Sequence, residues 1–267
     1  MRQDLIQAKA FEKHTLRARD GDIGHVEDLY FDDEQWRVRY LVVDTGGWLS
    51  GRRVLILPEQ VTGVDGEEGV VSLDLTREEV EASPPVGTEK PVSRQYEIQY
   101  YQYWGLVGWW ETFSFPGPAM GGGLGAEPAV PPPESLDRAE DEARRQHERN
   151  PNLRSLDEVR GYHIHAEDGA VGHVSDALVQ VEDWRLPFLE VSTRNWLPGR
   201  HVLIAPPWIE SVDWVEREVR VPLPRESIRT APEYEAGQSV TRDYELALYR
   251  HYGLSAGEEG EKEQETG

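Results

Sequence analysis

Three histidines in the second half of the sequence have the residue type and spacing of a metal site. His163 and His165 alternate along an expected strand and so share one of its faces. A hairpin centred on Gly169 would place His165 opposite His173. Three imidazoles there could bind zinc, nickel or copper. Histidines that are close together on an acidic surface are more often simply solvated, so we expect no metal and no cofactor and keep these three residues as the candidate to test.

Motifs of the common enzyme classes are absent from the sequence. There is no phosphate-binding glycine loop, no Gly-x-Ser-x-Gly nucleophile elbow and no His-Glu-x-x-His zinc motif. Cysteine does not occur, which excludes disulfides, thiolate metal sites and a cysteine nucleophile. Carboxylates are too numerous for any one pair to stand out as a catalytic acid and base. We therefore expect a protein that is not an enzyme.

The chain contains an internal duplication. A shift of 148 residues aligns Lys13–Leu106 with Gly161–Leu254 without a gap. Between Gly21 and Pro58, 19 of 38 positions are identical to their counterparts, too many for chance similarity. Repetition at a fixed period of this length indicates two copies of one small domain.

Short runs of β-branched and aromatic residues, bounded by Gly, Asp or Pro, dominate both copies. In the first copy we expect strands at Thr15–Ala18, Ile23–Phe31, Trp36–Asp44, Arg52–Leu57 and Val70–Leu75. The dipeptides Asp20-Gly21 and Asp168-Gly169 favour tight hairpin turns, and Gly24 and Gly172 are expected where a Cβ would clash. The fold class is therefore all-β dominated with short helices: two tandem small barrels, each closed around its own apolar interior.

A segment with helical spacing of aromatic residues follows each barrel. Tyr96, Tyr100 and Trp104 are four residues apart, and the second copy repeats this stripe up to Tyr252. Each helix could pack on its own barrel, which we favour, or could pair the two halves or contact a partner.

The candidate interaction residues lie in these segments and in two tryptophan-containing loops. Arg52 and Arg200 are close in sequence to Trp48 and Trp196, and could stack on the indoles to anchor a loop or to meet a partner. The full set of candidates is Trp48, Arg52, Trp196, Arg200, Tyr96, Tyr100, Tyr101 and Trp104.

These features divide the chain into six parts. They are a first barrel (1–90), an aromatic helical segment (91–108), a Gly/Pro-rich and charged linker (109–154), a second barrel (155–235), a second aromatic segment (236–254) and an acidic tail (255–267).

The net charge limits the classes of partner. A formal charge of -22 repels phosphate backbones and anionic lipid, so nucleic acid is not an expected partner. No apolar run approaches the roughly 20 residues that a membrane helix needs. We expect a cytoplasmic protein with protein partners, for which peripheral association with a membrane complex stays open.

Two repeated motifs resemble the PRC-barrel domain, a family named for the cytoplasmic domain of the photosynthetic reaction centre H subunit. They are Asp-Gly-x-x-Gly-His-Val-x-Asp and Trp-Leu-x-Gly-Arg-x-Val-Leu-Ile-x-Pro, and the resemblance covers Phe11–Ala82 and Val159–Thr230. The resemblance implies a protein-binding barrel without a fixed activity.

The functional expectation combines these observations. We expect a non-enzymatic protein-interaction or scaffold module. The alternative is a soluble accessory of a photosynthetic or respiratory electron-transfer complex, similar to the H subunit domain. The two barrels could pair within one chain or the chain could form a homo-oligomer, and the sequence leaves both open.

Overall fold

The computed structural model describes residues 5–47, 49, 51–83, 101–106, 152–193 and 200–253. The expectations for Trp48, Tyr96, Tyr100 and Trp196, for most of the linker and for the acidic tail lie outside these residues.

The elements appear twice, in the same order. The first set is β1 (Leu5–Gln7), α1 (Ala8–Phe11), β2 (Thr15–Ala18), β3 (Gly21–Asp32), β4 (Arg37–Asp44), β5 (Arg53–Ile56), η1 (Pro58–Gln60), β6 (Val61–Asp65), β7 (Val70–Leu73) and α2 (Arg77–Ala82). The second set is β8 (Leu153–Ser155), α5 (Leu156–Val159), β9 (His163–Ala166), β10 (Gly169–Gln180), β11 (Arg185–Ser192), β12 (His201–Ile204), η3 (Pro206–Trp208), β13 (Ser211–Asp213), β14 (Glu218–Arg220), α6 (Arg225–Thr230) and α7 (Arg242–His251). We call residues 15–106 the first half and residues 163–253 the second half.

The hairpin that opens each half forms as its sequence predicts. β2 pairs with β3 across the Asp20-Gly21 turn, with Ala18 opposite Gly21. A Cβ built on Gly24 would come within 2.0 Å of the carbonyl oxygen of Asp44, and one on Gly172 within 2.0 Å of that of Ser192. Only glycine lets the neighbouring strand approach this closely.

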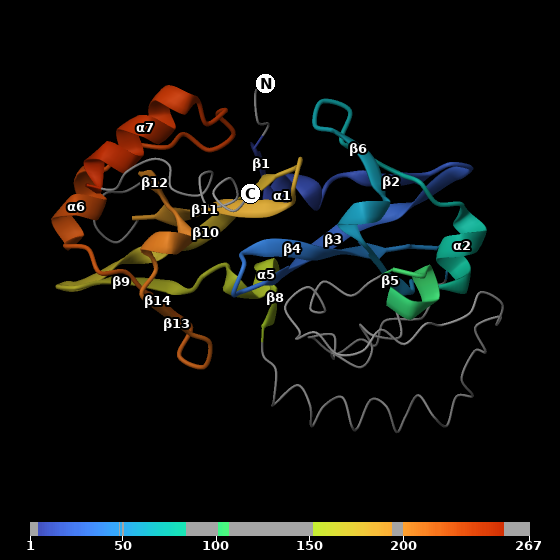
Figure 1. The fold of residues 1–267 in the computed structure, drawn as a ribbon, viewed down its shortest axis with the longest axis horizontal. Coiled ribbons are helices and arrows are strands. Elements are labelled where there is room, and N and C mark those ends of the chain that lie inside the picture. Colours follow the sequence, from blue (N-terminus) through green and yellow to red (C-terminus); the bar gives the residue numbers. More distant parts are fainter. Residues whose placement is uncertain are drawn as a thin grey trace, which may run out of the picture.

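The strand order is the same in both halves, and the two halves share one sheet. The order is β5-β4-β3-β2-β7-β6 in the first half and β12-β11-β10-β9-β14-β13 in the second. β4 and β11 meet at Arg37 and Arg185, where Val38 N donates to Trp184 O and Leu186 N donates to Trp36 O, each over 2.7 Å. Figure 1 shows the two halves joined end to end at this seam. Within the described residues, β5 and β6 are not paired with each other, so barrel closure by backbone hydrogen bonds is not observed.

The segment that precedes each half crosses over to the other half. We call residues 5–12 the first arm and residues 153–160 the second arm. β1 of the first arm pairs with β10, with Leu5 opposite Gln180, and β8 of the second arm pairs with β3, with Leu153 opposite Asp32. The 148-residue shift turns each of these pairings into the other. The two halves and their arms are therefore related by a pseudo-two-fold axis. Figure 1 shows α1 against the yellow strands of the second half and β8 beside the blue strands of the first.

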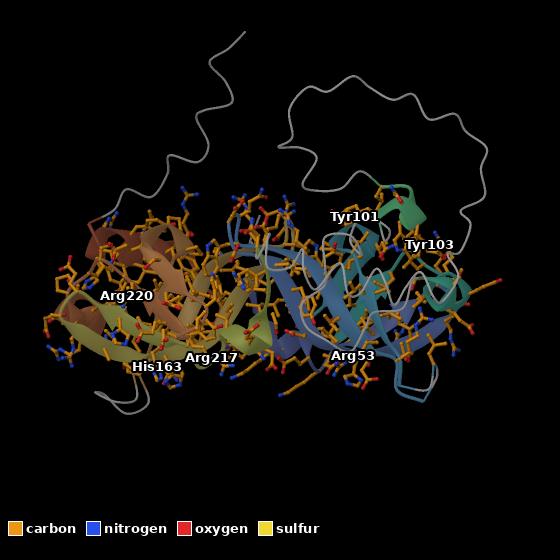
Figure 2. The ribbon with its side chains drawn as sticks, turned by 90° about the horizontal axis from the view of Figure 1, so that it is seen from below. Arg53, Tyr101, Tyr103, His163, Arg217 and Arg220 are labelled. Carbon is orange, nitrogen blue, oxygen red and sulfur yellow. The ribbon has the colours of Figure 1, made fainter. Side chains whose placement is uncertain are left out.

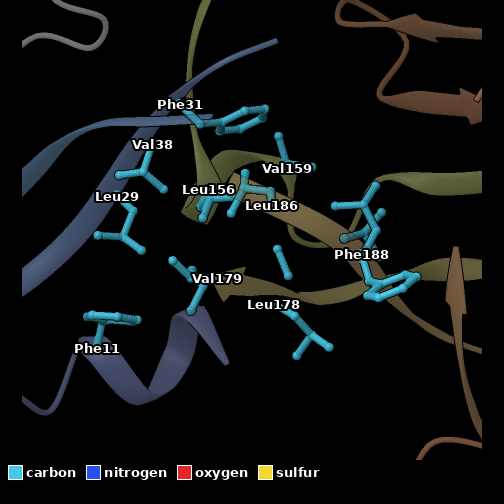
Figure 3. Packing of buried hydrophobic residues seen from close by; sticks show 14 of the residues in the cluster. Phe11, Leu29, Phe31, Val38, Leu156, Val159, Leu178, Val179, Leu186 and Phe188 are labelled. Atoms are coloured by element: carbon cyan, nitrogen blue, oxygen red, sulfur yellow. The ribbon is translucent and has the colours of Figure 1, made fainter. Parts of the chain in front are cut away.

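One hydrophobic core extends through both halves, so the expectation of two separate apolar interiors is wrong. Phe11 and Val159, from the two arms, are 0% and 1% exposed and belong to the same buried cluster as Leu29 and Leu178. Figure 3 shows residues of both arms and both halves in contact around the seam. Burying an arm side chain of this size contributes roughly 1.5–3 kcal/mol, so neither half keeps its full core without the arm of the other.

α7 packs on its own half, as favoured for the second aromatic segment, whereas only residues 101–106 of the first aromatic segment are described. Thr76 and Glu79 form a capping box at α2. At α7, Thr241 Oγ1 accepts a hydrogen bond from Tyr244 N over 3.2 Å, and Leu248 is fully buried. Residues 101–104 form a helical turn against a second, smaller cluster that contains Tyr40 and Leu55 of the first half and Leu153 of the second arm.

Candidate functional site

The three histidines do not meet as the simple hairpin register predicts, and this expectation is corrected. A register shift between Ala170 and Gly172 places His173 opposite His163 and leaves His165 opposite Ala170. His165 Nε2 instead lies 3.5 Å from Glu218 Oε1 on β14. Figure 2 shows His163 near Arg217 on the second half. Within the residues that the structure describes, no group of three or more potential ligands has the arrangement of a metal site.

The side chains of Arg52 and Arg200 are bound to backbone carbonyl oxygens. Arg52 Nη1 donates to the carbonyl oxygen of Glu81 over 3.0 Å, and its Nη2 donates to that of Ser83, so the guanidinium holds the end of α2. Arg200 Nη2 donates in the same way to the carbonyl oxygen of Ala231 after α6. Cations are favourable at the carbonyl end of a helix. Contact with Trp48 or Trp196 lies outside the described residues.

Tyr101 and Trp104 are less available to a partner than expected. Tyr101 is 4% exposed and its ring meets that of Tyr40 edge to face at 6.4 Å between centroids. Trp104 is half-buried and packs against both hydrophobic clusters. Tyr103 is also half-buried, and its hydroxyl lies 3.5 Å from the carbonyl oxygen of Glu79. Substitution of Tyr101 would therefore perturb packing before it tested binding.

Each arm donates hydrogen bonds to a buried aspartate of the other half. In the second half, the carboxylate of Asp176 is 2% exposed and accepts hydrogen bonds from Lys9 N of the first arm over 3.3 Å and from Ala177 N over 2.9 Å. Burial raises the pKa of Asp176, while the bond from Ala177 and the charge of Arg160 oppose that rise. The aspartate repeated in both sequence copies is thus a docking point for the arm.

The equivalent contact in the first half involves neutral donors. Asp28 accepts hydrogen bonds from Ser155 Oγ over 2.5 Å and from Asp157 N over 3.1 Å, both in the second arm. The Ser155 hydroxyl also caps α5 by accepting a hydrogen bond from Glu158 N over 3.1 Å. One hydroxyl therefore fixes both the start of the helix and its attachment to the first half.

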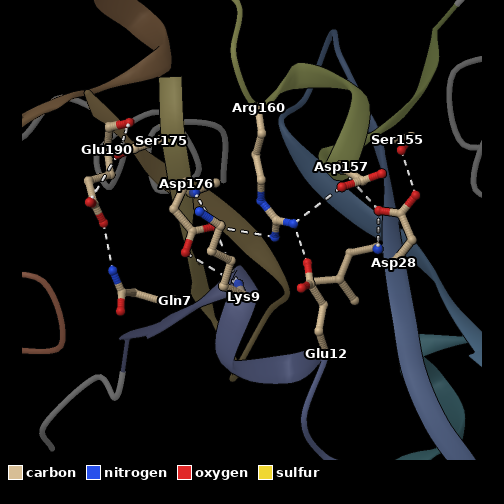
Figure 4. A network of polar contacts seen from close by, with 12 residues as sticks. Gln7, Lys9, Glu12, Asp28, Ser155, Asp157, Arg160, Ser175, Asp176 and Glu190 are labelled. Carbon is tan, nitrogen blue, oxygen red and sulfur yellow. Dashed lines mark hydrogen bonds and ion pairs between the residues drawn. The ribbon is translucent and has the colours of Figure 1, made fainter. Parts of the chain in front are cut away.

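Arg160 of the second arm lies at the centre of the polar network in Figure 4. Its guanidinium forms an ion pair with Glu12 of the first arm and lies 3.4 Å from Asp176 Oδ1 and 3.6 Å from Asp157 Oδ1. The side chains of Arg160 and Glu12 are 14% and 34% exposed. The ion pair joins residues that occupy equivalent positions in the two copies.

A second cluster surrounds Glu190 on β11. Its carboxylate accepts hydrogen bonds from Gln7 Nε2 of the first arm over 2.6 Å and from Ser175 Oγ over 3.0 Å, and lies 2.7 Å from His201 Nδ1. Burial, followed by the charge of Glu190, raises the pKa of nearby Tyr234 to about 12. Ser175 and His201 share one carboxylate oxygen, whereas a nucleophilic relay needs the imidazole between the hydroxyl and the acid. The arrangement holds the arm.

Arg154 is the functional residue that sequence reasoning missed. It lies on β8, its Nε donates to Asp33 Oδ2 over 2.9 Å, and its guanidinium lies 4.0 Å from the ring centroid of Trp214 in the second half. The pKa of Asp33 is raised by burial, and the hydrogen bond from Arg154 opposes part of that rise. The available sequence signal is the apolar spacing of the arms: Leu5, Ala8 and Phe11 recur as Leu153, Leu156 and Val159.

A surface cleft of about 320 Å³ opens at the seam between the halves. β4, η1, β6 and the turn at residues 181–184 line it, and it presents charges of both signs, among them Arg37, Glu59 and Glu182. A partner at this position would contact both halves together.

Comparison with known proteins identifies the class of the first half. It is a strand-rich domain with short helices, and residues 17–80 match the family model of the PRC-barrel domain. The chain thus carries a PRC-barrel domain, and its second half repeats the same strand order. No curated protein matches the chain. Within the described residues, no helix combines the length and the apolar character needed to cross a membrane.

Proposed function

We propose that this protein is a cytoplasmic, non-enzymatic interaction module in which two PRC-type halves act as one scaffold for a protein partner. One observation carries the proposal: three buried carboxylates that could perform acid–base chemistry already serve to hold the arms. The carboxylates of Asp28, Asp176 and Glu190 each accept hydrogen bonds from an exchanged arm. Such groups are saturated by structural contacts and present no free catalytic geometry.

The outward features of the halves support a binding role. In each half, an arginine directly before β5 or β12 donates a hydrogen bond to the backbone beyond the following helix. Segments that are fixed in place before binding are common binding elements because little entropy is lost when they meet a partner. The strongly negative charge favours a partner with a neutral or basic surface.

The test is capture of a partner by the intact chain in cells of its source. Lysine is scarce in this sequence, so a carboxylate-reactive cross-linker is the appropriate reagent. We expect one protein partner, cross-linked at defined positions and recovered in stoichiometric amounts. The variant Arg52→Ala with Arg200→Ala should lower recovery more than either single change, whereas exposed Arg19→Ala is the matched control.

The outcome also distinguishes the alternative function. Recovery with subunits of a photosynthetic or respiratory complex, together with fractionation with membranes, would assign the accessory role. Recovery no greater than that of an unrelated acidic protein of similar size would reject the interaction proposal.

A further inference from the structure

The arms meet at a pseudo-two-fold axis, where chemically identical residues would face each other if a half paired with a second copy of itself. In the chain as it exists, Glu12 faces Arg160 at equivalent positions. Two first halves, each with the first arm before it, would instead place Glu12 against Glu12, and two second halves with their second arms would place Arg160 against Arg160. Like charges at this distance in a partly buried site repel, because solvent screens them poorly.

A second difference lies along the arms. Arg154 of the second arm pairs with Asp33 of the first half, with side chains 13% and 11% exposed. Under the 148-residue shift, the corresponding positions hold Ile6 and Val181, both packed against the hydrophobic core. A pair of first halves would bring Ile6 onto Asp33, and a pair of second halves would bring Arg154 onto Val181. Both arrangements leave a buried charge without its partner, which is strongly unfavourable.

We infer that Glu12 and Arg160, together with Arg154 and Asp33, direct each half to pair with the other half and exclude pairing with a second copy of the same half. The backbone contacts do not discriminate, because Lys9 N to Asp176 and Asp157 N to Asp28 are equivalent bonds. The side chains at these four positions therefore decide partner choice. The consequence is that the first half of one copy does not pair with the first half of another, nor a second half with a second half.

The direct test uses full-length protein with a protease site inserted within residues 107–151, cleaved after folding. Native mass spectrometry then distinguishes pairs of unlike halves from pairs of like halves, because their masses differ. After incubation under conditions that permit exchange, we expect the wild type to give pairs of unlike halves with few like pairs. Glu12→Ala with Arg160→Ala should raise the fraction of like pairs about fivefold or more.

Two further variants sharpen the result. Arg154→Ile with Asp33→Val gives the contact between the second arm and the first half the same residue types as Ile6 and Val181 in the other contact. This variant should also raise the fraction of like pairs. Arg19→Ala with Asp74→Ala removes an exposed ion pair inside the first half and should leave the fraction unchanged. Equal fractions of like pairs in the wild type and in the Glu12→Ala, Arg160→Ala protein would overturn the inference.

An intact-chain measurement covers the case in which the cleaved halves unfold. Glu12→Ala and Arg160→Ala should each lower the melting temperature by about 3–10 °C, and the loss in the double variant should be smaller than the summed loss, because both changes remove the same ion pair. Losses that add up in full in the double variant would also overturn the inference. The fold and the proposed partner binding could both survive that result, so the two proposals fail separately.

Discussion

The two arm sites have the same backbone contacts and different side chains around them. Asp28 meets a serine hydroxyl and a backbone amide, whereas Asp176 meets a backbone amide and the guanidinium of Arg160. Where the second half buries Glu190 beside the first arm, the first half has Val42 at the equivalent position. The first site instead has its ion pair between Arg154 and Asp33, so the two sites carry charges at different positions.

This difference shows which parts of a duplicated fold can diverge. Two aspartates (Asp28 and Asp176) and two glycines that lie against a neighbouring carbonyl oxygen (Gly24 and Gly172) are the same in both copies, because the backbone requires them in each half. The charges near the seam differ between copies because only one combination of halves has to form. Experiments on matched positions can therefore separate what the fold needs from what the pairing needs.

The largest expected effect on stability is at Gly24 and Gly172, which lie against carbonyl oxygens of the neighbouring strand. Gly24→Ala should lower the free energy of unfolding by about 3 kcal/mol or more, because its Cβ would overlap the carbonyl oxygen of Asp44. Gly172→Ala meets the same overlap at Ser192 but lacks the positive φ of 151° found at Gly24, so its loss should be smaller by about 1 kcal/mol. Urea unfolding of both variants checks the order. A loss below 1 kcal/mol at either position would contradict the close approach.

The loop anchors should show a moderate and unequal effect. Arg52→Ala removes hydrogen bonds to two carbonyl oxygens and should cost about 2 kcal/mol, whereas Arg200→Ala removes one and should cost about 1 kcal/mol. Hydrogen exchange at the amides of α2 and α6 would locate the loosening. Equal losses, or loosening far from these helices, would contradict the anchoring role.

The pH dependence of stability should reveal the contribution of Asp176, which binds the first arm. Burial raises the pKa of Asp176 above its ordinary 3.8, so folding favours the neutral carboxyl. Its contribution to stability is greatest below pH 3.8 and is lost as the pH rises through the folded pKa. Asp176→Asn should therefore gain stability relative to the wild type over that rise.

Carbon-13 titration of the Asp176 side chain provides the direct measurement for this prediction. A folded pKa at or below 3.8 would show that the hydrogen bonds and Arg160 outweigh burial.

The smallest expected effect compares the two helix starts after the sheets. Thr76→Ala removes the capping box of α2 and should cost about 1 kcal/mol. Pro224 gives α6 no side-chain cap, so Pro224→Ala should change stability by less than about 0.5 kcal/mol. Thermal unfolding of the two variants provides the comparison, and a larger effect at Pro224 would contradict it.

Local patterns predicted most of the strands. β2 begins and ends where the sequence placed it, and β3, β4, β5 and β7 differ by at most two residues at either end. The arms escaped prediction because their strands and helices are only three and four residues long and their pairing partners are more than 120 residues away. The histidine register failed because a register shift after Ala170 has no sequence signature strong enough to place it.

The sequence by itself determined the duplication, the turn glycines and the alternation that builds each sheet, because these depend on spacing and backbone geometry within a few residues. Only the tertiary structure decided that the arms cross over, that the core is shared and that Glu12 meets Arg160. The reason is physical: an arm is too short to bury its apolar face alone, so its location depends on which surface offers a matching cavity and a matching charge. That surface belongs to the other half of the chain.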